Sequence, residues 1–561
     1  MMQNKLIETD CGVIGGGLAG CTVALELADG GKHVELFVKG RFGEDCNSSL
    51  IAGGLAAVQL PTKMSNNDSI DFHIEDTLKA GKRLNDAKIV MYCVENFFTD
   101  VIEYLIGRGV KFDKDNGDFS LNREGGHSKS RIFHISDTTG LKIMETLEKL
   151  VRAHSNITVH ENHLVIDLVT KNKTQKSKGK DSCLGFYVYD IEEDYVKSVQ
   201  CNATFIATGG LGKAFLYTSN TDNSTGDGFT ICYRSGIPLV NMEFIQFHPT
   251  VFYDPYAVTA GERRFLFTEA LRGAGAILKL SKQSGEDFVL KYDPLGSRAT
   301  RDIVVMAEDI EMRKNGLNHV WLDCTILRKD ILKNEFKNSY DFCLSKGLNL
   351  AKEPVPVVYA AHYSNGGALV NMHSETEIKG CYVVGETSYT GFHGANRLAS
   401  NSGPECVLFG RLAARHFLLN SDDSSPLKIP LWNIGEAVES KDKITVDFYW
   451  EVIRRTMHFL CGMSRNNDRL IAAQELLRSL KKSINSYYWN YRVSKDFLEV
   501  RNIVDVASMI IESALARKES RACHFREDFP KVNNEDFLGL TIIKKENKPY
   551  ILKFNETILK K

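Results

Sequence analysis

A glycine-rich turn close to the N-terminus constrains the fold of this chain more than any other feature. Gly15-Gly16-Gly17-Leu18-Ala19-Gly20 follows a short apolar run, Cys11 to Ile14, and precedes a segment of helical periodicity, Cys21 to Leu27. In the pattern Gly-x-Gly-x-x-Gly between a strand and a helix, the first glycine makes the turn. The second lets the backbone approach a pyrophosphate, and the third packs the helix on the strand. The helix N-terminus supplies the anion site. The pattern therefore predicts a doubly wound α/β domain that binds a dinucleotide.

The second predicted strand, His33 to Phe37, ends in an unusual way for such a domain. An acid at this strand end would accept a hydrogen bond from a ribose hydroxyl. Here Val38-Lys39-Gly40 follows the strand, and Glu35 lies within it. We expect Lys39 to neutralise a phosphate or to line the adenosine side of the site. A solvent-exposed surface lysine is the alternative.

Three further stretches suit the same domain, although they lie far apart in the sequence. Ser48 to Ala57 is small, apolar and paired in glycine, Phe205 to Gly210 is an apolar strand ending in Thr-Gly-Gly, and Gly380 to Glu386 is a strand ending in Gly-Glu. Cofactors lie at the strand ends of doubly wound sheets. We therefore predict a nucleotide-binding domain built from residues 1–243 and 353–425, interrupted by an α+β capping domain at 244–352.

The C-terminal part is predicted to be a helical bundle. Arg455 to Leu480 and Asp496 to Leu515 carry apolar residues at spacings of i, i+3 and i+4, which suits helices that pack on one another. We place this helical domain at 430–535, and residues 536–561 remain a tail without an assigned role.

Composition argues against several classes of protein. A net charge of −1 gives no attraction to nucleic acid or to an anionic membrane. The 13 cysteines show no Cys-x-x-Cys spacing and no adjacent histidine cluster, which speaks against a metal site or a disulfide framework. No apolar run reaches the about eighteen residues of a membrane-spanning helix, and too few residues precede the first strand for a signal peptide. We expect a cytoplasmic protein with reduced thiols, no metal, and neither a membrane nor a nucleic-acid partner.

Polar residues with complementary chemistry recur in and around the predicted insert. They are His248, Thr268, Glu269, Arg272, Arg301, His362 and Arg397. Two histidines, a hydroxyl and a guanidinium suit a dicarboxylate, because arginine binds carboxylates through two parallel hydrogen bonds. Glu269, Arg272 and Arg301 could form a charged chain that leads to this ligand, or Glu269 and Arg272 could be only a helix-surface pair. An arginine can serve as an acid–base group only beside a carboxylate relay, since its free pKa is too high.

In combination these motifs resemble the superfamily of succinate dehydrogenase and fumarate reductase flavoproteins, to which the L-aspartate oxidases also belong. The resemblance runs from about residue 8 to residue 530. It rests on the glycine turn and on Phe247-His248-Pro249-Thr250, Thr268-Glu269-x-x-Arg272-Gly273, Arg301-Asp302, His362-Tyr363-x-x-Gly366-Gly367 and His393-Gly394-Ala395-Asn396-Arg397-Leu398.

Three features favour the L-aspartate oxidases within this superfamily. The segment from Arg123 to Ser128 resembles the oxidase segment whose glutamate, here Glu124, faces the substrate ammonium group. The respiratory subunits attach flavin covalently to a histidine six residues before a Gly-Gly pair. Counting back from Gly53 gives Asn47, which implies non-covalent FAD. The stretches 397–402 and 269–273 also follow the oxidase pattern.

The chain departs from the family pattern at several positions. Ala52 stands where glutamine is usual, and Asn365 stands where cysteine is usual. Ala274 stands at the glutamate position of the expected Arg-Gly-Glu-Gly, and Gly403-Pro404 replaces a Leu-Leu pair. None of these changes removes a proposed catalytic group. Ala52 and Gly403-Pro404 match positions beside the isoalloxazine ring, so the affinity or potential of the flavin is expected to shift.

The resemblance implies a role for each site residue. Arg301 would be the proton donor and acceptor, with Glu269 and Arg272 as its relay. His248, Thr268, His362 and Arg397 would hold the two carboxylates, and Glu124 would pair with the ammonium. Asp227 and Glu386 would lie near the ribityl–phosphate arm. The residues expected to bind FAD are Gly15, Gly16, Gly17, Leu18, Ala19, Gly20, Lys39, Asn47, Ser48, Ser49, Gly53, Gly54, Asp227, Glu386, Ser402 and Gly403.

The implied reaction is the FAD-dependent oxidation of L-aspartate to iminoaspartate, the first step toward quinolinate and NAD. Electrons would pass to O2 or fumarate, and quinolinate synthase would be the downstream enzyme. One alternative is a fumarate reductase or succinate dehydrogenase flavoprotein subunit, which would need an iron–sulfur subunit that the oxidase reading does not include. A flavin-binding protein without turnover is the second alternative.

Overall fold

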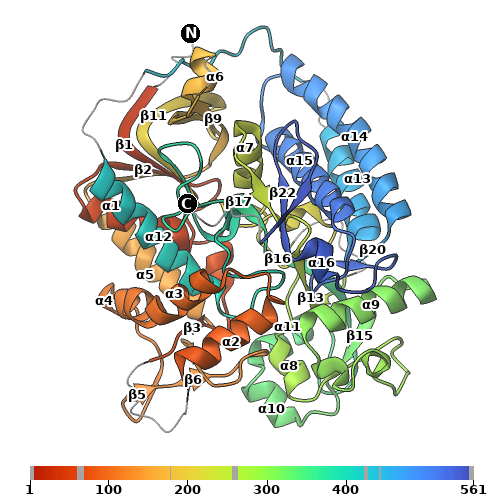
Figure 1. Cartoon of the computed structure of the whole chain (residues 1–561). Helices are drawn as coiled ribbons and strands as arrows, with labels where there is room; N and C mark the ends of the chain where they lie inside the picture. The colour runs from red at the N-terminus through yellow and green to blue at the C-terminus, as the bar shows by residue number, and fades with distance from the viewer. Residues whose placement is uncertain are drawn as a thin grey trace.

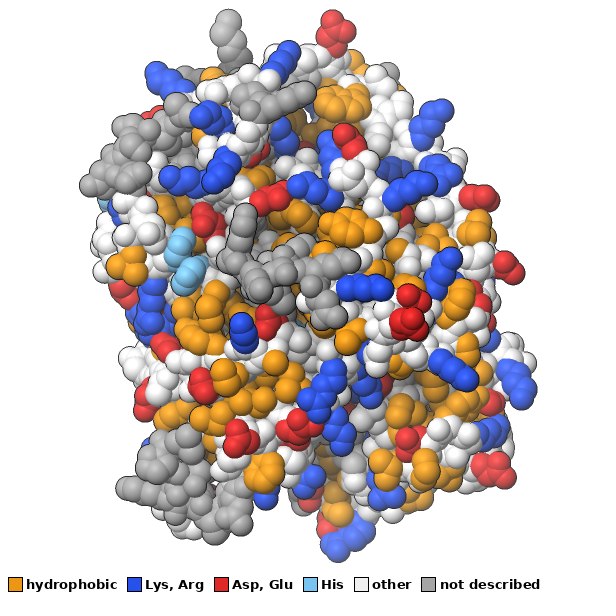
Figure 2. Space-filling view, in the orientation of Figure 1, with side chains coloured by type: hydrophobic (Ala, Val, Ile, Leu, Met, Phe, Trp, Pro, Cys, Tyr) orange, Lys and Arg blue, Asp and Glu red, His pale blue; other side chains and the backbone are white. Residues whose placement is uncertain are grey.

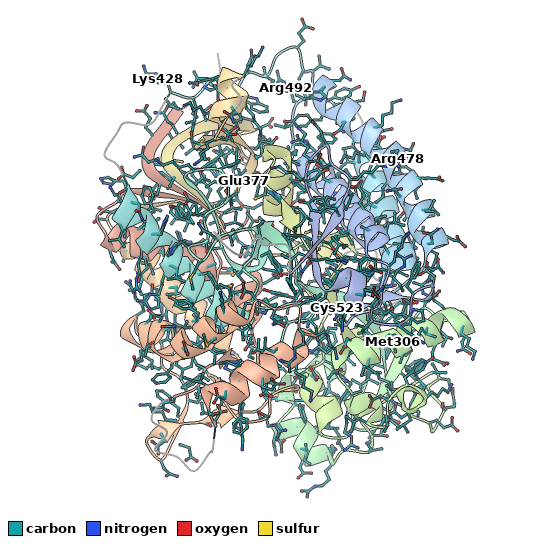
Figure 3. The ribbon with its side chains drawn as sticks, viewed as in Figure 1. Met306, Glu377, Lys428, Arg478, Arg492 and Cys523 are labelled. Atoms are coloured by element: carbon teal, nitrogen blue, oxygen red, sulfur yellow. The ribbon has the colours of Figure 1, made fainter. Side chains whose placement is uncertain are left out.

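The computed structural model describes residues 6–59, 68–176, 179–254, 263–421, 428–440 and 444–554. Figure 1 shows an α/β part, a smaller mixed part and a group of long helices near the C-terminus. This arrangement confirms the predicted fold class. All 13 cysteines are free thiols, and most are buried, including Cys523 (Figure 3).

Within the described residues, the largest sheet has seven strands and joins distant parts of the chain. Its order is β8 (Ile157–His160), β2 (Val34–Phe37), β1 (Leu6–Ile14), β11 (Tyr195–Ile206), β10 (Cys183–Asp190) and β9 (His163–Thr170), with β18 (Cys381–Val383) also paired to β11. The strands β8, β2, β1, β11 and β18 run parallel to their neighbours in this group. Strand β10 pairs antiparallel with β11 on one side and with β9 on the other. The half of β1 next to the glycine turn is buried throughout, because helices cover both faces of a parallel sheet. The pairing of β18 with β11 confirms that this domain is discontinuous in sequence.

Helices α1 (Leu18–Asp29), α5 (Thr139–Ala153) and α12 (Ser402–Asn420) pack together beside this sheet, and α1 and α12 lie side by side (Figure 1). Gly20 permits the packing at the start of α1, since a Cβ there would lie 1.8 Å from the carbonyl oxygen of Gly15. Other elements of this part are α2 (Ile70–Ala80), α3 (Ala87–Phe97), α4 (Tyr104–Gly107), α6 (Lys171–Gln175), α7 (Asp227–Ser235), β3 (Leu55–Ala56), β4 (Lys114–Asp115), β5 (Asp118–Phe119), β6 (Leu121–Asn122) and β7 (Ile132–Phe133).

The inserted part is built on a four-stranded sheet in the order β13 (Ile245–Phe252), β16 (Val355–Ser364), β15 (Val320–Asp323) and β14 (Ile277–Lys279). Its helices are α8 (Glu269–Gly273), α9 (Arg301–Asn315), α10 (Lys329–Asn334) and α11 (Lys337–Ser345). One boundary differs from the sequence prediction, which placed residues after 352 in the nucleotide-binding domain. Strand β16 pairs with β13, so residues 355–364 share a sheet with the insert. Apolar alternation alone does not say which sheet a strand joins.

The C-terminal helices are α13 (Ile444–Cys461), α14 (Asn467–Asn490) and α15 (Lys495–Ala516), which pack on one another. The predicted apolar stretch from Arg455 to Leu480 is therefore two helices. The second begins where the Asn466 side chain accepts a hydrogen bond from Arg469 N, a helix cap. Short strands β20 (Ser464–Arg465) and β21 (Phe525–Arg526) also pair in this part.

The predicted tail is part of a second sheet. Strand β22 (Gly539–Ile543) lies between β12 (Leu239–Val240) and β23 (Tyr550–Lys553), and β17 (Gly367–Leu369) and β19 (Ser388–Tyr389) complete the sheet. Helix α16 (Asn534–Phe537) precedes β22. Every residue of β22 is buried. The described part of 536–561 is therefore integrated into the fold and is not a loose extension.

The surface carries charges of both signs. Figure 2 shows basic and acidic side chains interspersed with apolar ones on the face drawn, without a large area of one sign. In the described ranges, no helix has both the length and the hydropathy needed to cross a membrane.

Candidate active site and cofactor cleft

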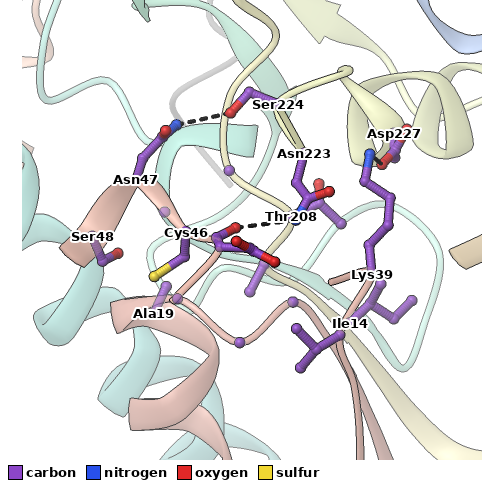
Figure 4. A pocket seen from close by; sticks show the side chains of 18 of the residues that line it. Ile14, Ala19, Lys39, Cys46, Asn47, Ser48, Thr208, Asn223, Ser224 and Asp227 are labelled. Carbon is purple, nitrogen blue, oxygen red and sulfur yellow. Dashed lines mark hydrogen bonds and ion pairs between the residues drawn. The ribbon is translucent and has the colours of Figure 1, made fainter. Parts of the chain in front are cut away.

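A cleft opens at the carboxyl ends of the parallel strands β1, β2 and β11 (Figure 4). Of the residues predicted to bind a dinucleotide, ten line it. They are Gly15, Gly16, Gly17, Leu18, Ala19, Lys39, Asn47, Ser48, Asp227 and Glu386. Thr208, Asn223 and Ser224 add polar groups. The location agrees with the rule that ligands of open α/β sheets bind at the strand ends.

The glycine turn has the geometry of an anion cradle. Gly15 has a φ of +110°, and a Cβ on it would lie 2.2 Å from the carbonyl oxygen of Ala207. Gly17 is the N-cap of α1, and no acid occupies the first turn of that helix. The Ser48 hydroxyl accepts a hydrogen bond from Leu18 N at 3.0 Å. A helix dipole and a wall without a Cβ fit a pyrophosphate, so these residues fit a dinucleotide cofactor.

Lys39 and Asp227 lie together in this cleft. The Lys39 ammonium is 2.8 Å from Asp227 Oδ2 and 2.6 Å from Thr225 Oγ1 (Figure 4). Lys39 was expected to neutralise a phosphate or to line the adenosine side, and the resemblance assigned Asp227 to the ribityl–phosphate arm. The ion pair places the two side chains next to each other. The alternative of a surface lysine is wrong, because the Lys39 side chain is only 9% exposed. Burial alone would lower the pKa of Lys39, but Asp227 and Glu499 outweigh burial and raise the pKa.

Glu386 and Asn47 are held by backbone groups. Glu386 Oε1 accepts from Ser364 N at 2.9 Å, and a Cβ at Gly210 would lie 2.4 Å from the same oxygen. Burial raises the pKa of Glu386 to about 7. Asn47 accepts from Thr221 N and donates to Ser224 Oγ. An amide in this position has no nucleophilic nitrogen that could bond to a flavin, unlike a histidine ring.

Six predicted cofactor residues do not line the cleft: Gly20, Ser49, Gly53, Gly54, Ser402 and Gly403. Ser49 donates to the carbonyl oxygens of Glu44 and Cys46, which ties down its own turn. A Cβ at Gly54 would lie 2.2 Å from a carbonyl oxygen, and one at Gly403 would lie 2.2 Å from the Leu55 side chain. The absence of a side chain at Gly54 and Gly403 therefore permits close packing beside the cleft.

Arg397 is the buried centre of the polar constellation. It donates from NH2 to Gln246 Oε1 at 2.9 Å and from NH1 to Ser402 Oγ at 2.9 Å, and its guanidinium lies 4.5 Å from the ring centre of Tyr363. Its backbone N–H donates to Asn365 Oδ1 at 2.8 Å. Asn365, which departs from the family pattern, therefore anchors the Arg397 backbone.

Both predicted histidines lie beside each other, with ring centres 5.5 Å apart. His248 Nδ1 accepts from Thr250 N, and His362 Nδ1 lies 2.7 Å from Ser219 Oγ. Burial, reinforced by nearby guanidinium groups, lowers the pKa of each histidine well below its usual value. Both rings are therefore neutral near pH 7, and His248, whose Nδ1 accepts, can donate a hydrogen bond from Nε2 without a charge.

Arg301, Glu269 and Arg272 form the chain that their spacing suggested. Arg301 Nε is 2.5 Å from Glu269 Oε2, and Arg272 NH2 is 3.7 Å from Glu269 Oε1. Burial by itself would raise the pKa of Glu269, but Arg301 and Arg272 outweigh it and lower the pKa. Arg272 is 1% exposed and donates to Ser297 O. The pair is therefore not a helix-surface pair. The ion-pair partner of Arg301 is Glu269.

Glu124 approaches this chain from another segment. Its Oε2 accepts from Ser400 Oγ at 2.5 Å. A Cβ on Gly53 would lie 1.8 Å from Glu124 Oε1, and one on Gly125 would lie 2.6 Å from Glu269 Oε1. Both glycines therefore permit close contact between the loops that carry these acids. Burial raises the pKa of Glu124. Thr268 begins α8, where its hydroxyl accepts from Ala270 N.

Gln246 and Ser400 were missed as site residues. Gln246 lies two residues before His248 on β13, so both side chains leave the same face of the strand. That alternation could have identified Gln246. Ser400 has a φ of +57°, a backbone conformation that is uncommon for a residue other than glycine, and the sequence carries no signal for it.

Comparison with known proteins places these features in a family. Residues 10–402 match the FAD binding domain, and residues 451–560 match the C-terminal part of the fumarate reductase flavoprotein. L-aspartate oxidase 1 of Ralstonia nicotianae is 44% identical over 526 residues, which cover 93% of this chain and 96% of that protein. The chloroplastic L-aspartate oxidase 2-b of Nicotiana tabacum is 35% identical over 553 residues, which cover 95% of this chain and 83% of that protein. A solved structure of E. coli quinol fumarate reductase superposes with a TM-score of 0.83 at 26% identity, covering 98% of this chain and 96% of that one.

Proposed function

Because this chain belongs to the L-aspartate oxidase family of FAD-dependent proteins, we propose that it oxidises L-aspartate to iminoaspartate. The observation that carries the proposal is the carboxylate of Glu124, which adds an acid to a cluster of guanidinium groups and neutral histidines. Cationic and neutral donors suit the two carboxylates of a dicarboxylate. The added acid suits the ammonium that aspartate has and succinate lacks.

Arg397 is proposed to clamp one carboxylate. Its guanidinium is already oriented by Gln246 and Ser402, so little side-chain entropy is lost when a ligand binds. His248, His362 and Thr268 would complete the dicarboxylate site as neutral hydrogen-bond donors. Neutral donors avoid adding a third and fourth positive charge next to Arg301 and Arg397.

Oxidation to iminoaspartate removes a hydride from Cα and a proton from nitrogen. Bound FAD supplies the two-electron acceptor. The chain would hold it with Gly15 to Ala19, Lys39, Asn47, Ser48, Asp227 and Glu386, without a covalent bond. In the reverse sense, with fumarate as acceptor, Arg301 would donate a proton from its guanidinium to the substrate carbon. Glu269 would return that proton, with Arg272 as the next member of the relay, and the 2.5 Å Arg301–Glu269 contact supports this transfer.

The surroundings of the reaction are proposals of the same kind. Iminoaspartate would pass to quinolinate synthase on the route to quinolinate and NAD, and O2 or fumarate would accept the electrons. The chain would work in the cytoplasm without an iron–sulfur subunit. The structural similarity to quinol fumarate reductase favours a fumarate reductase flavoprotein as the second candidate function. A flavin-binding protein without turnover is the outcome if no substrate reduces the FAD.

Anaerobic mixing of the FAD-loaded protein with L-aspartate tests the function directly. We expect loss of the oxidised flavin absorbance and release of oxaloacetate, the hydrolysis product of iminoaspartate. Succinate in place of aspartate is the comparison. Reduction by succinate but not by aspartate would favour the second candidate, and reduction by neither would leave only a flavin-binding role.

Glu124→Gln tests the recognition of the ammonium group. We expect aspartate oxidation, as kcat/KM, to fall about tenfold to a hundredfold, the value of a charged hydrogen bond. Fumarate reduction should fall much less, because fumarate has no ammonium. Glu145→Gln removes a carboxylate from the exposed face of α5 and is the control. Equal losses in both reactions would make Glu124 a structural residue.

A further inference from the structure

We propose that the C-terminal helical domain is part of the cofactor site, because Glu499 and Asn502 of α15 position the cleft residues Lys39 and Asp227. The inference rests on the FAD site of the proposed function and extends it to a domain that is distant in sequence. Lys39 and Asp227 line the cleft, whereas Glu499 and Asn502 stand behind them.

The Lys39 ammonium is the first point of contact. It lies 2.6 Å from Thr225 Oγ1, 2.8 Å from Asp227 Oδ2 and 3.0 Å from Glu499 Oε1. Thr225 and Asp227 accept hydrogen bonds from the ammonium, and Glu499 forms an ion pair with it. The exposed fractions of the Lys39, Asp227 and Glu499 side chains are 9%, 8% and 8%. The stem of Lys39 is therefore fixed in one direction by an acid from α15.

Asn502 fixes the second cleft residue. Its Nδ2 donates to Asp227 Oδ1 at 2.8 Å. Its Oδ1 accepts from Thr230 Oγ1 and from Arg234 NH1, at 3.1 Å and 3.0 Å. Because Arg234 can only donate, it sets the orientation of the amide and leaves Nδ2 to Asp227. Asn502 thus bridges α7, which begins at Asp227, and α15.

Spacing on α15 explains how one helix performs both tasks. Residues three apart in a helix lie on the same face, and Glu499 and Asn502 are three apart. Both are almost fully buried, so this face of α15 is the outer wall of the Lys39 end of the cleft. The strand β2 ends in lysine instead of the usual ribose-binding acid, and the carboxylate of Asp227, held from α15, lies beside that lysine.

A thermodynamic consequence follows. If α15 must be docked for Lys39 and Asp227 to be in place, then FAD binding and docking of the helical domain favour each other by the same factor. Loss of the Glu499 charge should therefore be seen in FAD affinity, although Glu499 itself stays behind the cleft wall.

The test uses full-length apoprotein titrated with FAD, with quenching of flavin fluorescence as the readout. We expect Glu499→Gln and Asn502→Ala each to raise the Kd for FAD about tenfold, the scale of a lost supporting contact behind a binding site. Glu512→Gln removes the same charge from the same helix, at a residue near Lys481 and Arg478, and is the matched control. Its Kd should match that of the unmodified protein.

A double variant separates positioning from general destabilisation. In a Lys39→Met background, Glu499→Gln should change the Kd for FAD far less than it does alone, because its partner is gone. Unchanged FAD affinity in both Glu499→Gln and Asn502→Ala would overturn the proposal. An equal loss in Glu512→Gln would overturn it as well. If Glu499→Gln does not fold, the proposal is tested by comparing the Kd for FAD of Asn502→Ala with that of Glu512→Gln. If aspartate does not reduce the flavin while the FAD affinities change as expected, the proposed function is wrong and this inference still holds.

Discussion

At the scale of single residues, the site depends on charged groups that are held by partners from other segments. Arg397 is held by Gln246, Ser402 and Asn365, and Glu124 by Ser400. A buried guanidinium that keeps hydrogen bonds while facing a cavity is costly to desolvate, so its partners are needed to keep it in place. The same holds for Arg301, which pairs with Glu269.

Arg301→Lys tests the proton-transfer role. Lysine keeps the charge but not the planar donor beside Glu269. We expect fumarate reduction to fall by about two or more orders of magnitude, while FAD content stays normal. Arg298→Lys, three residues earlier and exposed, is the control and should behave like the unmodified enzyme. Near-normal turnover in Arg301→Lys would remove Arg301 from the mechanism.

Glu386 predicts a pH dependence of stability in the FAD-free protein. Its pKa is about 7 in the folded state and near 4.5 when unfolded, so the folded state holds the proton more tightly. As pH rises from about 4.5 to 7, the unfolded state loses its proton first and folding is weakened, by about 1.4 kcal/mol for each unit of pKa difference. Above pH 7 this contribution is constant.

The measurement compares urea unfolding of the FAD-free protein and of Glu386→Gln between pH 4.5 and 8. The variant should lose less free energy of unfolding across this range, since its amide does not titrate. Parallel pH profiles for the two proteins would show that Glu386 does not carry the effect.

At the scale of elements, the strand β22 lies inside a sheet that no sequence pattern indicated. It pairs with β12, and its Thr541 donates to Glu243 Oε1 at 2.5 Å. Glu243 also pairs with Arg517 at 2.6 Å, and neither side chain is exposed at all. The start of the insert, the end of α15 and the C-terminal strand are therefore joined by one buried network.

Thr541→Val tests that network. The substitution preserves shape but leaves Glu243 with one donor fewer, so the free energy of unfolding should fall by about 1–3 kcal/mol. Thr146→Val removes a hydroxyl that bonds only a backbone carbonyl on α5, and its effect should stay within about 0.5 kcal/mol. Denaturant unfolding measures both. Equal effects would mean that the buried network adds nothing beyond an ordinary hydrogen bond.

At the scale of the whole molecule, the cofactor cleft draws on segments spread along most of the chain. Its walls come from residues 14–19, 37–48, 163–165, 207–209, 221–231, 384–386 and 406, and α15 supports it from behind. A ligand that contacts several segments stabilises their assembled state, because it binds the folded chain and not the unfolded one.

FAD should therefore raise the melting temperature of the entire protein in one transition. At a free concentration of one hundred times its Kd, the expected stabilisation is about 2.7 kcal/mol. Differential scanning calorimetry with and without FAD measures this. A separate transition of the helical domain that does not respond to FAD would contradict a single cooperative unit.

Acid precipitation of the FAD-loaded protein should release all yellow colour into the supernatant, because Asn47 cannot attach flavin. Colour retained in the pellet would contradict non-covalent binding.

Local sequence patterns were sufficient for the parts that depend on backbone geometry and on short spacing. Gly15, Gly17 and Gly20 predicted the turn, the helix and the strand around them, because a positive φ and close contacts without a Cβ exclude other residues. Glu269 and Arg272 are three residues apart on a short helix. Complementary charge placed Arg301 in one chain with them, and the resemblance implied its role in proton transfer. The order of motifs along the chain also indicated a discontinuous domain, since strand ends of one sheet must meet.

Contacts between distant segments were decided only by the tertiary structure. No sequence pattern near Lys39 indicates its contact with Glu499. No pattern near Glu124 indicates its contact with Ser400. The sequences of strands β16 and β22 are ordinary apolar segments, and their pattern did not determine which strands they pair with. The physical reason is that periodicity fixes which face of an element is buried, whereas the element that covers this face is chosen by packing of the whole chain. The sequence thus determined the chemistry of the site, and the tertiary structure determined which residues hold that chemistry in place.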